Sequence, residues 1–378
     1  NNLVMKIVYC LHSTFNSGGM ERIVLGKANW LADHGYEVII VTTEQHGRTA
    51  FFPIHPSIRQ FDLGINYSDY NKASFIRKFV AFLAKRKLHK RKLMAFLNNV
   101  RADIVISTFG NELGLLPSIN DGSKKIAEIH FSRFFRMQEG RKGMFRLVDY
   151  FRSICDKKHV SKYSRLVLLT NEDAKHWSKL KNIVIIPNFT LITHDISKQD
   201  AKRAISVGRL TYQKGYDILI PIWAKVVQRH SDWHLDIFGS GEDKNKLQEL
   251  IEQYSISRHV TIHNPTPMIV QEYLHSSIYL LSSRYEGFPL VLCEALNYGL
   301  ASVVMACKCG PKDLVVDGES GFLVDEGDID TYVERTCQLI ENKSLRERIG
   351  KNAHQRISQC FSSEVVMQQW TQLFDKLC

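Results

Sequence analysis

Apolar and polar positions along the chain follow two alternating patterns from one end to the other. Short runs rich in Val and Ile, such as Glu-Val-Ile-Ile-Val-Thr at 37–42, alternate with longer stretches that carry apolar residues at helical spacing, such as 21–33. Unbroken apolar runs are typical of strands buried on both faces, which occur in parallel sheets with helical crossovers. The pattern therefore predicts an α/β fold.

The alternation of strand-like and helix-like segments forms two series, which are separated by a linker. The first series ends at Pro187-Asn188, and a polar stretch at 193–202 precedes the second. We therefore predict two consecutive doubly wound, Rossmann-like domains with parallel sheets, at 1–190 and 191–361. The expected strands are 6–10, 37–42, 58–63, 103–107, 125–130, 165–169 and 183–186, followed by 204–207, 234–238, 260–263, 278–281, 302–305 and 322–324. The expected helices are 21–33, 216–229, 243–253, 268–275, 290–298, 328–342 and 364–377.

Composition excludes several classes of protein. Of the 378 residues, 44% are hydrophobic and 24% charged, which is typical of a globular protein and not of a disordered or collagenous one. No run approaches the roughly 18 apolar residues that a membrane-spanning helix needs, and the first residues lack a signal-peptide layout. The eight cysteines show no CxxC spacing, which favours reduced thiols in a cytoplasmic protein over a disulfide framework or a zinc site.

The net charge of +11 is unevenly distributed along the chain. Residues 1–200 hold 31 Lys and Arg against 17 Asp and Glu, whereas residues 201–378 hold 19 against 22. A basic half beside a near-neutral half indicates that a polyanion or an anionic surface faces the first half.

The basic residues are densest at 71–100, where nine Lys and Arg interleave with apolar residues and no Asp or Glu occurs. Such a stretch suits an anionic membrane surface or a lipid-linked pyrophosphate. A solvated helix that covers one flank of the first sheet stays open as an alternative. No nucleic-acid-binding module is present, so we expect no nucleic-acid partner. The expected membrane or acceptor contacts are Lys85, Arg86, Lys87, Lys90 and Arg91.

Glycines follow the first predicted strand and open the first predicted helix. Gly18 and Gly19 lie in the segment Asn-Ser-Gly-Gly-Met-Glu at 16–21. Two glycines there allow backbone N–H groups and a helix N-terminus to approach an anion closely. The segment is not a GxGxxG, so no dinucleotide fingerprint is present, and a plain turn is the alternative.

Two cations follow the first strand of the second domain. Arg209 and Lys214 lie in a glycine-flanked loop at 206–216, where the chain should leave the carboxyl end of a strand. Ligands of open α/β sheets bind at that end. An Arg fork and a Lys point charge beside a helix N-terminus can clamp a diphosphate. Two solvated basic side chains are the alternative.

Two carboxylates eight residues apart flank a Gly-Phe-Pro turn. Glu286 should project from the loop, whereas Glu294 lies about two turns into the following helix. The loop N–H groups at 287–290 lie between them and suit phosphate and sugar hydroxyls. An acidic residue complements the helix dipole only in the first turn, and Glu294 lies deeper than that. The dipole therefore does not explain Glu294, and the segment indicates a binding site.

Two other features could carry chemistry. His130 ends a predicted strand at the expected ligand edge, although a histidine there can also be a structural hydrogen-bonding residue. Asp328-Ile-Asp330 matches the metal-binding DxD motif, but it lies between a predicted strand and the start of a predicted helix. Carboxylates in that position cap the helix, and this interpretation is favoured.

The segment Gly-Arg-Leu with Gln-Lys-Gly at 208–215, followed by Glu286-Gly-Phe-Pro-Leu and Glu294, resembles the GT4 family of glycosyltransferases, of the type that builds bacterial surface polysaccharides. The resemblance covers nearly the whole chain. It implies a retaining, nucleotide-sugar-dependent enzyme of the GT-B fold, with two Rossmann-like domains facing a cleft. It also implies an N-terminal acceptor-side domain, on which a C-terminal helix at about 362–378 packs back, and a C-terminal nucleotide-sugar domain.

The resemblance also implies roles for individual residues. Arg209 and Lys214 would hold the donor diphosphate and stabilise the leaving group. Glu286 would lie near the transferred sugar, Glu294 would bind the ribose hydroxyls, and His130 would orient the donor sugar. The other implied donor contacts are Gly18, Gly19, Gly208, Gly239, Gly287, Phe288, Pro289 and Leu290.

The implied reaction is transfer of a hexose or N-acetylhexosamine from a nucleotide diphosphate sugar, more often UDP-linked than GDP-linked, to a lipid-linked or surface-glycan acceptor. No cofactor or metal is expected, because the two cations and the loop dipoles would stabilise the charge of the diphosphate in place of Mg²⁺. The expected location is cytoplasmic, with peripheral attachment to the inner face of the cell membrane left open. Two alternatives stay open: a GT-B nucleotide-sugar 2-epimerase, and a non-catalytic glycan-binding or scaffold protein on the same fold.

Overall fold

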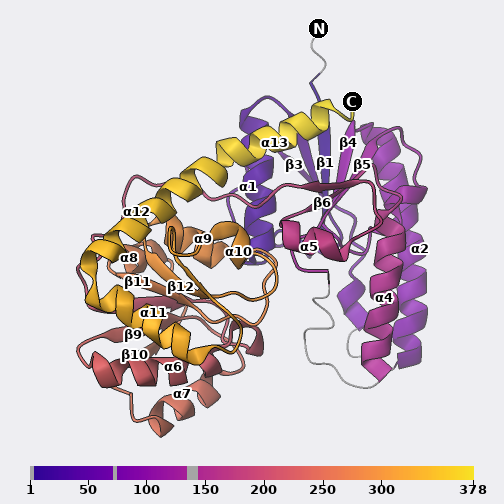
Figure 1. Ribbon diagram of the computed structural model, residues 1–378. Helices are drawn as coiled ribbons and strands as arrows, with labels where there is room; N and C mark the ends of the chain where they lie inside the picture. The colour runs from indigo at the N-terminus through magenta and orange to yellow at the C-terminus, as the bar shows by residue number, and fades with distance from the viewer. Residues whose placement is uncertain (1–3, 71–74, 134–143) are drawn as a thin grey trace. The chain divides into compact units, whose positions relative to one another are not determined.

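The structure is a computed structural model that describes residues 4–70, 75–133 and 144–378, and its chain divides into two units (Figure 1). The end of the chain belongs to the same unit as its beginning. Unit 1 comprises residues 1–169, 174–186 and 367–378, and unit 2 comprises residues 170–173 and 187–366.

Unit 1 is built on a seven-stranded sheet in the order β3-β2-β1-β4-β5-β6-β7, and its neighbouring strands pair in parallel. The central strands are rich in buried Val and Ile, because helices cover both faces of the sheet. The strands are β1 (Lys6–Leu11), β2 (Glu37–Thr42), β3 (Arg59–Asp62), β4 (Ile104–Ser107), β5 (Lys124–Glu128), β6 (Arg165–Leu168) and β7 (Ile183–Ile185).

The helices of unit 1 lie on both faces of the sheet. α2 and α4 cover one face and α1 lies on the other (Figure 1). Successive residues of a strand point to opposite faces, so Val8 and Cys10 of β1 share a core with Leu93 and Leu97 of α2. The helices are α1 (Gly19–Asp33), α2 (Phe75–Val100), α4 (Met144–Val160) and most of α13 (Ser363–Asp375), with α5 (Asn171–His176) at the border of the units and the short turns η1 (Tyr67–Tyr70) and η2 (Leu116–Ser118).

Unit 2 has a six-stranded sheet in the order β10-β9-β8-β11-β12-β13, also parallel throughout. Its core joins the strands to α6 and α11, with Trp223 and Tyr332 fully buried. The strands are β8 (Arg203–Val207), β9 (His234–Phe238), β10 (Val260–His263), β11 (Ile278–Leu281), β12 (Ala301–Met305) and β13 (Phe322–Val324). The helices are η3 (Tyr212–Lys214), α6 (Tyr216–Arg229), α7 (Lys244–Gln253), α8 (Ile269–Leu274), α9 (Leu290–Asn297), α10 (Pro311–Leu314), α11 (Ile329–Glu341) and α12 (Lys343–Cys360).

The two parallel-sheet, Rossmann-like domains that the sequence predicts are confirmed. In each sheet the strand order reverses at one point, between β1 and β4 in unit 1 and between β8 and β11 in unit 2. Ligands of open α/β sheets bind beside the carboxyl ends of the strands at such a point. The loops after these four strands are therefore where a site should be sought.

Two α-helices of unit 2, the short α10 and the long α12, have no counterpart in the sequence-based expectation. α12 buries a narrow stripe that holds Ile349, Ala353 and Ile357 together with Arg346 and a glycine. Only three of the 18 residues are buried apolar side chains, a narrow stripe that gives weak helical periodicity, which is why the pattern did not predict the helix. Its start is fixed by a side-chain cap, because Asn342 Oδ1 accepts a hydrogen bond of 2.9 Å from the backbone N–H of Leu345.

The basic stretch of the first half forms α2, a helix of 26 residues. No helix among the described residues is both long enough and apolar enough to cross a bilayer. His89 is buried on this helix beside the core residues Leu93 and Leu97, and its Nδ1 lies 3.1 Å from the hydroxyl of Tyr67. Burial, together with the positive charge of Arg86, lowers the pKa of His89 to about 4.

This lowered pKa should make the protein sensitive to acid. Between pH of about 6.5 and about 4 the unfolded chain binds a proton at His89 that the folded chain does not, so the free energy of unfolding should fall as the pH is lowered through that window. In a His89→Gln variant this part of the fall, up to about 3 kcal/mol, should disappear from urea unfolding curves. His34→Gln, at an exposed position, should keep the wild-type profile. Equal pH dependence of the His89→Gln variant and the wild type would contradict the assignment.

Candidate active site

The loop after β8 is shaped by glycines at close backbone contacts. Gly215 adopts a left-handed conformation with φ of 66°, and a Cβ atom there would lie 2.1 Å from the carbonyl oxygen of Ser282. A Cβ atom at Gly239 would lie 1.9 Å from the carbonyl oxygen of Gly208. Only glycine fits at these two places. The close approach places the β8 loop against the residues that follow β9 and β11.

Lys214 and Glu286 form an ion pair at the switch point of the unit 2 sheet. Lys214 Nζ lies 2.7 Å from Glu286 Oε1, and the hydroxyl of Ser283 donates a hydrogen bond of 2.6 Å to the same oxygen. The Lys214 side chain is 12% exposed and that of Glu286 only 6%. Two elements that are 72 residues apart in sequence thus meet, because β8 and β11 are neighbours in the sheet. The sequence marked both residues but not their direct contact.

Arg209 is exposed and is held by a residue that the sequence reasoning missed. Its Nη2 donates 2.9 Å to Gln213 Oε1, and Gln213 Nε2 donates 3.0 Å to the carbonyl oxygen of Tyr285. Gln213 therefore joins the β8 loop to the β11 loop. It lies in the Gln-Lys-Gly segment that carries the family resemblance, and that was the available signal.

A second connection between the same loops is made by Arg284. Its guanidinium donates two hydrogen bonds, of 2.8 and 2.7 Å, to the carboxylate of Asp217, and it lies over the ring of Tyr212 at 4.0 Å. A bidentate pair fixes both the distance and the orientation of its partners. Arg284 thereby braces the turn from which Glu286 projects.

The Gly-Phe-Pro turn leads directly into α9. Phe288 is buried, and Pro289 occupies the N-cap position. Within the part of the chain that the structure describes, no group accepts a hydrogen bond from the backbone N–H groups of Gly287, Phe288 or Leu290. N–H groups at a helix start are suited to phosphate or hydroxyl oxygens, as the sequence predicted for this turn.

A cavity of about 220 Å³ lies within unit 2, at the loops that follow β8, β9 and β10. It is lined by Gly208, Arg209, Gly239 and Glu294, all of which the sequence analysis had selected. Glu294 is half-buried, and the hydroxyl of Tyr273 donates 3.3 Å to its Oε2. The loop after β10 contributes Pro265 and Thr266 to the wall of the cavity. The other lining residues are Val207, Phe238, Ser240 and Ile269.

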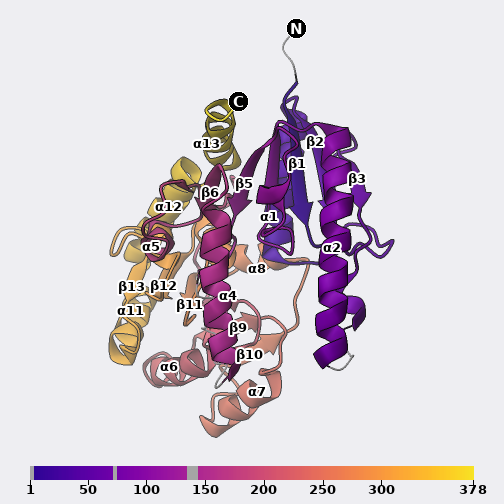
Figure 2. The same cartoon turned by 90° about the vertical axis from the view of Figure 1, so that its right-hand side faces the viewer.

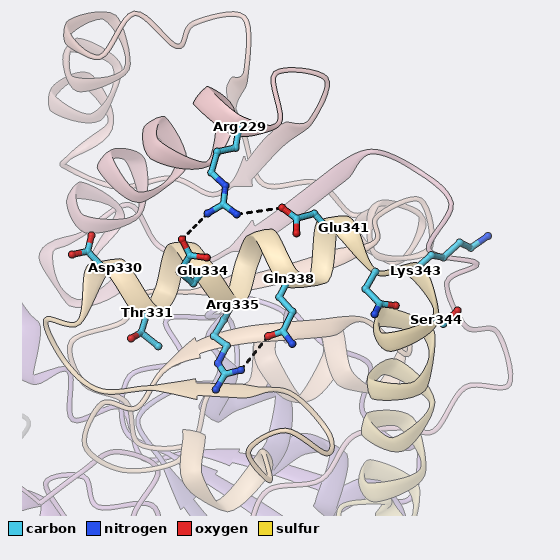
Figure 3. A pocket seen from close by; sticks show the side chains of 10 residues that line it. Arg229, Asp330, Thr331, Glu334, Arg335, Gln338, Glu341, Lys343 and Ser344 are labelled. Atoms are coloured by element: carbon cyan, nitrogen blue, oxygen red, sulfur yellow. Dashed lines mark hydrogen bonds and ion pairs between the residues drawn. The ribbon is translucent and has the colours of Figure 1, made fainter.

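A larger hollow, of about 990 Å³, lies elsewhere on unit 2, between α6 and α11 (Figure 3). Its walls are exposed ion pairs, such as Arg229 with Glu334 at 2.6 Å. The DxD sequence belongs to this surface: Asp328 Oδ1 accepts 3.1 Å from the N–H of Thr331, and Asp330 pairs with Lys225 at 2.7 Å. The helix-cap interpretation is therefore correct for Asp328. Among the described residues, no group of three or more His, Cys, Asp or Glu is arranged to hold a metal ion.

Gly18 and Gly19 lie where the sequence predicted, at the start of α1. The Gly18 N-cap is extended, with φ of −72°, so no unusual backbone conformation requires glycine there. A Cβ atom at Gly18 would lie 2.3 Å from Glu21 Oε2, so a larger residue there would displace only the end of that side chain. Glu21 is buried and lies in the first turn, where its negative charge complements the helix dipole. The approach of the two glycines to a diphosphate stays a prediction.

His130 follows β5 in unit 1 and adjoins a buried ion pair. Its Nε2 lies 3.1 Å from Glu128 Oε1, and Glu128 in turn pairs with Lys27 of α1. Lys27 Nζ also lies 4.4 Å from the ring centre of Trp370 in α13. The side chains of Lys27, Glu128 and His130 are each at least 97% buried. The sequence marked His130 but gave no sign of Lys27, which a helical pattern places among polar surface positions.

The basic residues of α2 do not share one environment. Lys85 pairs with Asp69 at 2.8 Å, and the guanidinium of Arg86 lies next to Gly114 and His159. Lys87, Lys90 and Arg91 are exposed. Lys72, in the basic stretch at 71–100, lies outside the described residues, as does the side chain of Lys78. Of the five predicted contact residues, these three exposed cations are therefore best placed to touch a membrane surface.

Comparison with known proteins gives consistent results. The profile of the family described as "Glycosyl transferases group 1" matches residues 192–356, which contain the site built above. An "Uncharacterized glycosyltransferase" of Haemophilus influenzae is 30% identical over 373 residues, covering 97% of this chain and 98% of the relative. The "Amylovoran biosynthesis glycosyltransferase AmsD" of Erwinia amylovora is 26% identical over 393 residues, covering 98% and 99%.

A solved structure has a similar fold. A mutant of S. aureus TarM, in complex with Fondaparinux, alpha-GlcNAc-glycerol and UDP, superposes with a TM-score of 0.77 over 98% of this chain and 100% of its own. The sequence identity is 17%, so this likeness shows the fold alone.

Proposed function

We propose, from the premise that this chain belongs to the glycosyl transferases group 1 family, that it transfers a hexose or N-acetylhexosamine from a UDP-linked donor to a lipid-linked or surface-glycan acceptor, with retention of configuration at the anomeric carbon. We also assign it to the GT4 enzymes within that family. One observation carries the proposal: Gly208, which lines the cavity together with Arg209, Gly239 and Glu294, lies against Lys214, where a Cβ atom on the glycine would be 3.1 Å from Lys214 Cε, and Lys214 pairs with Glu286.

The parts of the donor match the parts of the site. The cavity of about 220 Å³ is smaller than the roughly 300–1,000 Å³ of a pocket for a whole ligand, so it suits the nucleoside. Glu294 at its wall can accept hydrogen bonds from both ribose hydroxyls. Arg209, Lys214 and the N–H groups at 287–290 then lie where a diphosphate attached to that nucleoside would extend.

The chemistry needs stabilisation of a leaving diphosphate. The bond between the anomeric carbon and the β-phosphate oxygen breaks, its electron pair leaves with UDP, and the acceptor hydroxyl bonds to the carbon and loses its proton. Negative charge therefore grows on the β-phosphate in the transition state, where Lys214 and Arg209 are most effective. Two fixed cations and helix-start dipoles can supply this stabilisation, so we propose that transfer is independent of a divalent metal.

The acceptor is inferred from two kinds of support. AmsD is named for amylovoran biosynthesis, and TarM was solved with saccharide ligands and UDP. The exposed cations Lys87, Lys90 and Arg91 of α2 suit an anionic membrane surface, where lipid-linked saccharides are located. We therefore place the reaction on the cytoplasmic side of a membrane, with the enzyme attached peripherally.

Nucleotide binding tests the donor assignment most directly. At a hundredfold excess over its dissociation constant a ligand stabilises the folded protein by about 2.7 kcal/mol, so UDP should raise the Tm in a thermal-shift measurement more than GDP or ADP do. EDTA should leave the UDP shift unchanged. A Glu294→Ala variant should lose most of the shift, because the ribose hydroxyls lose their acceptor, whereas Glu334→Ala, in the exposed ion pairs of α11, should keep it.

The outcome is decisive in either direction. A larger shift with GDP or ADP would overturn the UDP assignment, and a UDP shift that requires Mg²⁺ would overturn metal independence. Release of an epimerised free sugar from UDP-sugar without any acceptor would instead favour the 2-epimerase. In the transfer reaction, NMR of the new glycosidic linkage reports whether the anomeric configuration is retained.

A further inference from the structure

α4 presents an apolar surface to solvent that the functional site does not use. Leu147, Val148, Tyr150, Phe151 and Ile154 are each 47–64% exposed. Large apolar residues that are exposed singly are ordinary, but five within eight positions of one helix form a contiguous patch. Such a patch indicates a binding partner that is apolar.

The orientation of α4 is the reverse of that expected for a surface helix. Asp149 and Ser153 face the interior and are buried, while the apolar side chains face outward. At about 100° per residue, the exposed apolar side chains span an arc of about 160°, with Arg146 at one margin and Arg152 at the other. A wide apolar arc bordered by two cations is the pattern of a helix that lies in a lipid–water interface.

α2 repeats the pattern at the same end of unit 1. Phe79, Val80, Phe82 and Leu83 near its start are 38–60% exposed. In both views α2 and α4 begin beyond the same end of the sheet, toward which the strand arrows point (Figures 1 and 2). This follows from the topology, because a crossover helix between parallel strands runs antiparallel to them. Both apolar surfaces therefore flank the carboxyl edge of the unit 1 sheet, where β5 ends before His130.

We propose that the apolar arc of α4, from residue 146 to residue 155, inserts together with the N-terminal half of α2 into the headgroup region of an anionic bilayer, with α4 supplying most of the apolar contact. Charge favours lipid over a protein partner: the exposed charged residues on the described parts of both helices are all cations. The cations are Arg77, Lys87, Lys90, Arg91 and Lys92 on α2, and Arg146, Arg152 and Lys158 on α4.

The functional reason for membrane binding rests on the proposed lipid-linked acceptor, whereas the experiments below do not depend on it. An enzyme held at the bilayer by these two helices presents the carboxyl edge of its unit 1 sheet toward the headgroups. A saccharide carried on a lipid pyrophosphate projects from that same layer. The insertion of apolar side chains, rather than charge alone, sets this orientation.

Vesicle binding and insertion test the proposal without any turnover. Vesicles of phosphatidylethanolamine and phosphatidylglycerol in equal parts should co-sediment the wild type at about 0.15 M salt, and a substantial fraction should stay bound at about 1 M salt, where the Debye length is about 3 Å. The triple variant Leu147→Ser, Phe151→Ser, Ile154→Ser should bind at least about tenfold more weakly, because three large apolar side chains no longer leave water. A matched triple, Phe51→Ser, Leu191→Ser, Tyr254→Ser, removes exposed apolar residues elsewhere and should bind like the wild type.

Cys155 gives a direct readout of insertion, since it is exposed on the apolar arc of α4. The other exposed thiols among the described residues are removed by Cys360→Ser and Cys378→Ser. The emission of an environment-sensitive fluorophore on Cys155 should then shift to shorter wavelength when the anionic vesicles are added.

Three results would each overturn the proposal: no vesicle binding by the wild type, equal binding by the α4 triple variant, or unshifted emission of the fluorophore. The proposal would also be overturned if the wild type formed a dimer and bound no vesicles, and the α4 triple variant were monomeric. The apolar surface would then join two copies of the chain. UDP binding that persists in the α4 triple variant separates failure of this inference from failure of the proposed function.

Discussion

Replacing Lys214 with alanine is expected to lower kcat/KM for the nucleotide sugar by about a hundred- to a thousandfold, the effect of removing one preorganised charge that stabilises a transition state. The loss should fall on kcat more than on KM, because the charge of the leaving diphosphate grows during bond breaking. Initial rates of UDP release, measured over a range of donor concentrations, separate the two. An unchanged kcat/KM would remove Lys214 from the proposed clamp.

The same substitution leaves Glu286 buried without its cation, so reduced activity could reflect reduced stability. The double variant Lys214→Met, Glu286→Gln removes both charges of the 2.7 Å pair and should unfold at nearly the wild-type urea concentration. Its activity should nevertheless stay low, because the leaving group still lacks its cation. Lys225→Ala, which breaks an exposed pair with Asp330, should change neither quantity. Recovery of activity in the double variant would mean that Lys214 acts only by neutralising Glu286.

Replacing Lys27 with methionine is expected to destabilise the protein by about 3–5 kcal/mol, the cost of leaving one partner of a buried ion pair uncompensated. Lys27 and Glu128 are both almost fully buried, and burial lowers the pKa of Lys27. Burial alone would raise the pKa of Glu128, but Lys27 and His130 outweigh it and hold that pKa at about 2. Urea unfolding near pH 7 measures the effect.

Two controls separate charge from packing at this position. Lys27→Met with Glu128→Gln removes both charges and should regain most of the lost stability, because Met still packs beside Trp370. In the wild type, Glu128 has a lower pKa folded than unfolded, so its stabilising contribution is complete above a pH of about 4.3. It should then be lost as the pH falls toward about 2. A Lys27→Met variant as stable as the wild type would contradict a compensated buried pair.

The site residues of unit 2 could be selected from sequence because each belongs to a local signal. Arg209 and Lys214 lie in one short loop, and Glu286 and Glu294 flank one turn. Alternation of apolar runs and helical stretches also places each loop at the carboxyl end of a strand. What this reasoning could not supply was the contact between the two loops, since strand order in the sheet decides it.

Residues that act through long-range contacts were missed for the same reason. Lys27 and Glu128 are 101 positions apart, and neither has a neighbour in sequence that reveals the pair. Arg284 and Asp217 are 67 positions apart and meet only because β8 and β11 adjoin. On α4 the sequence shows a mixture of apolar, basic and acidic residues, and only burial reveals that Asp149 faces inward and Phe151 outward.

The sequence by itself determined the two α/β domains, the loops at the strand ends and the residue types suited to a nucleotide sugar, because periodicity, glycine placement and short motifs are local properties of the chain. The tertiary structure alone decided which of these residues touch, which charges are compensated and which apolar side chains stay in water. Those properties depend on strand order and burial, and both are set by contacts between residues far apart in the sequence.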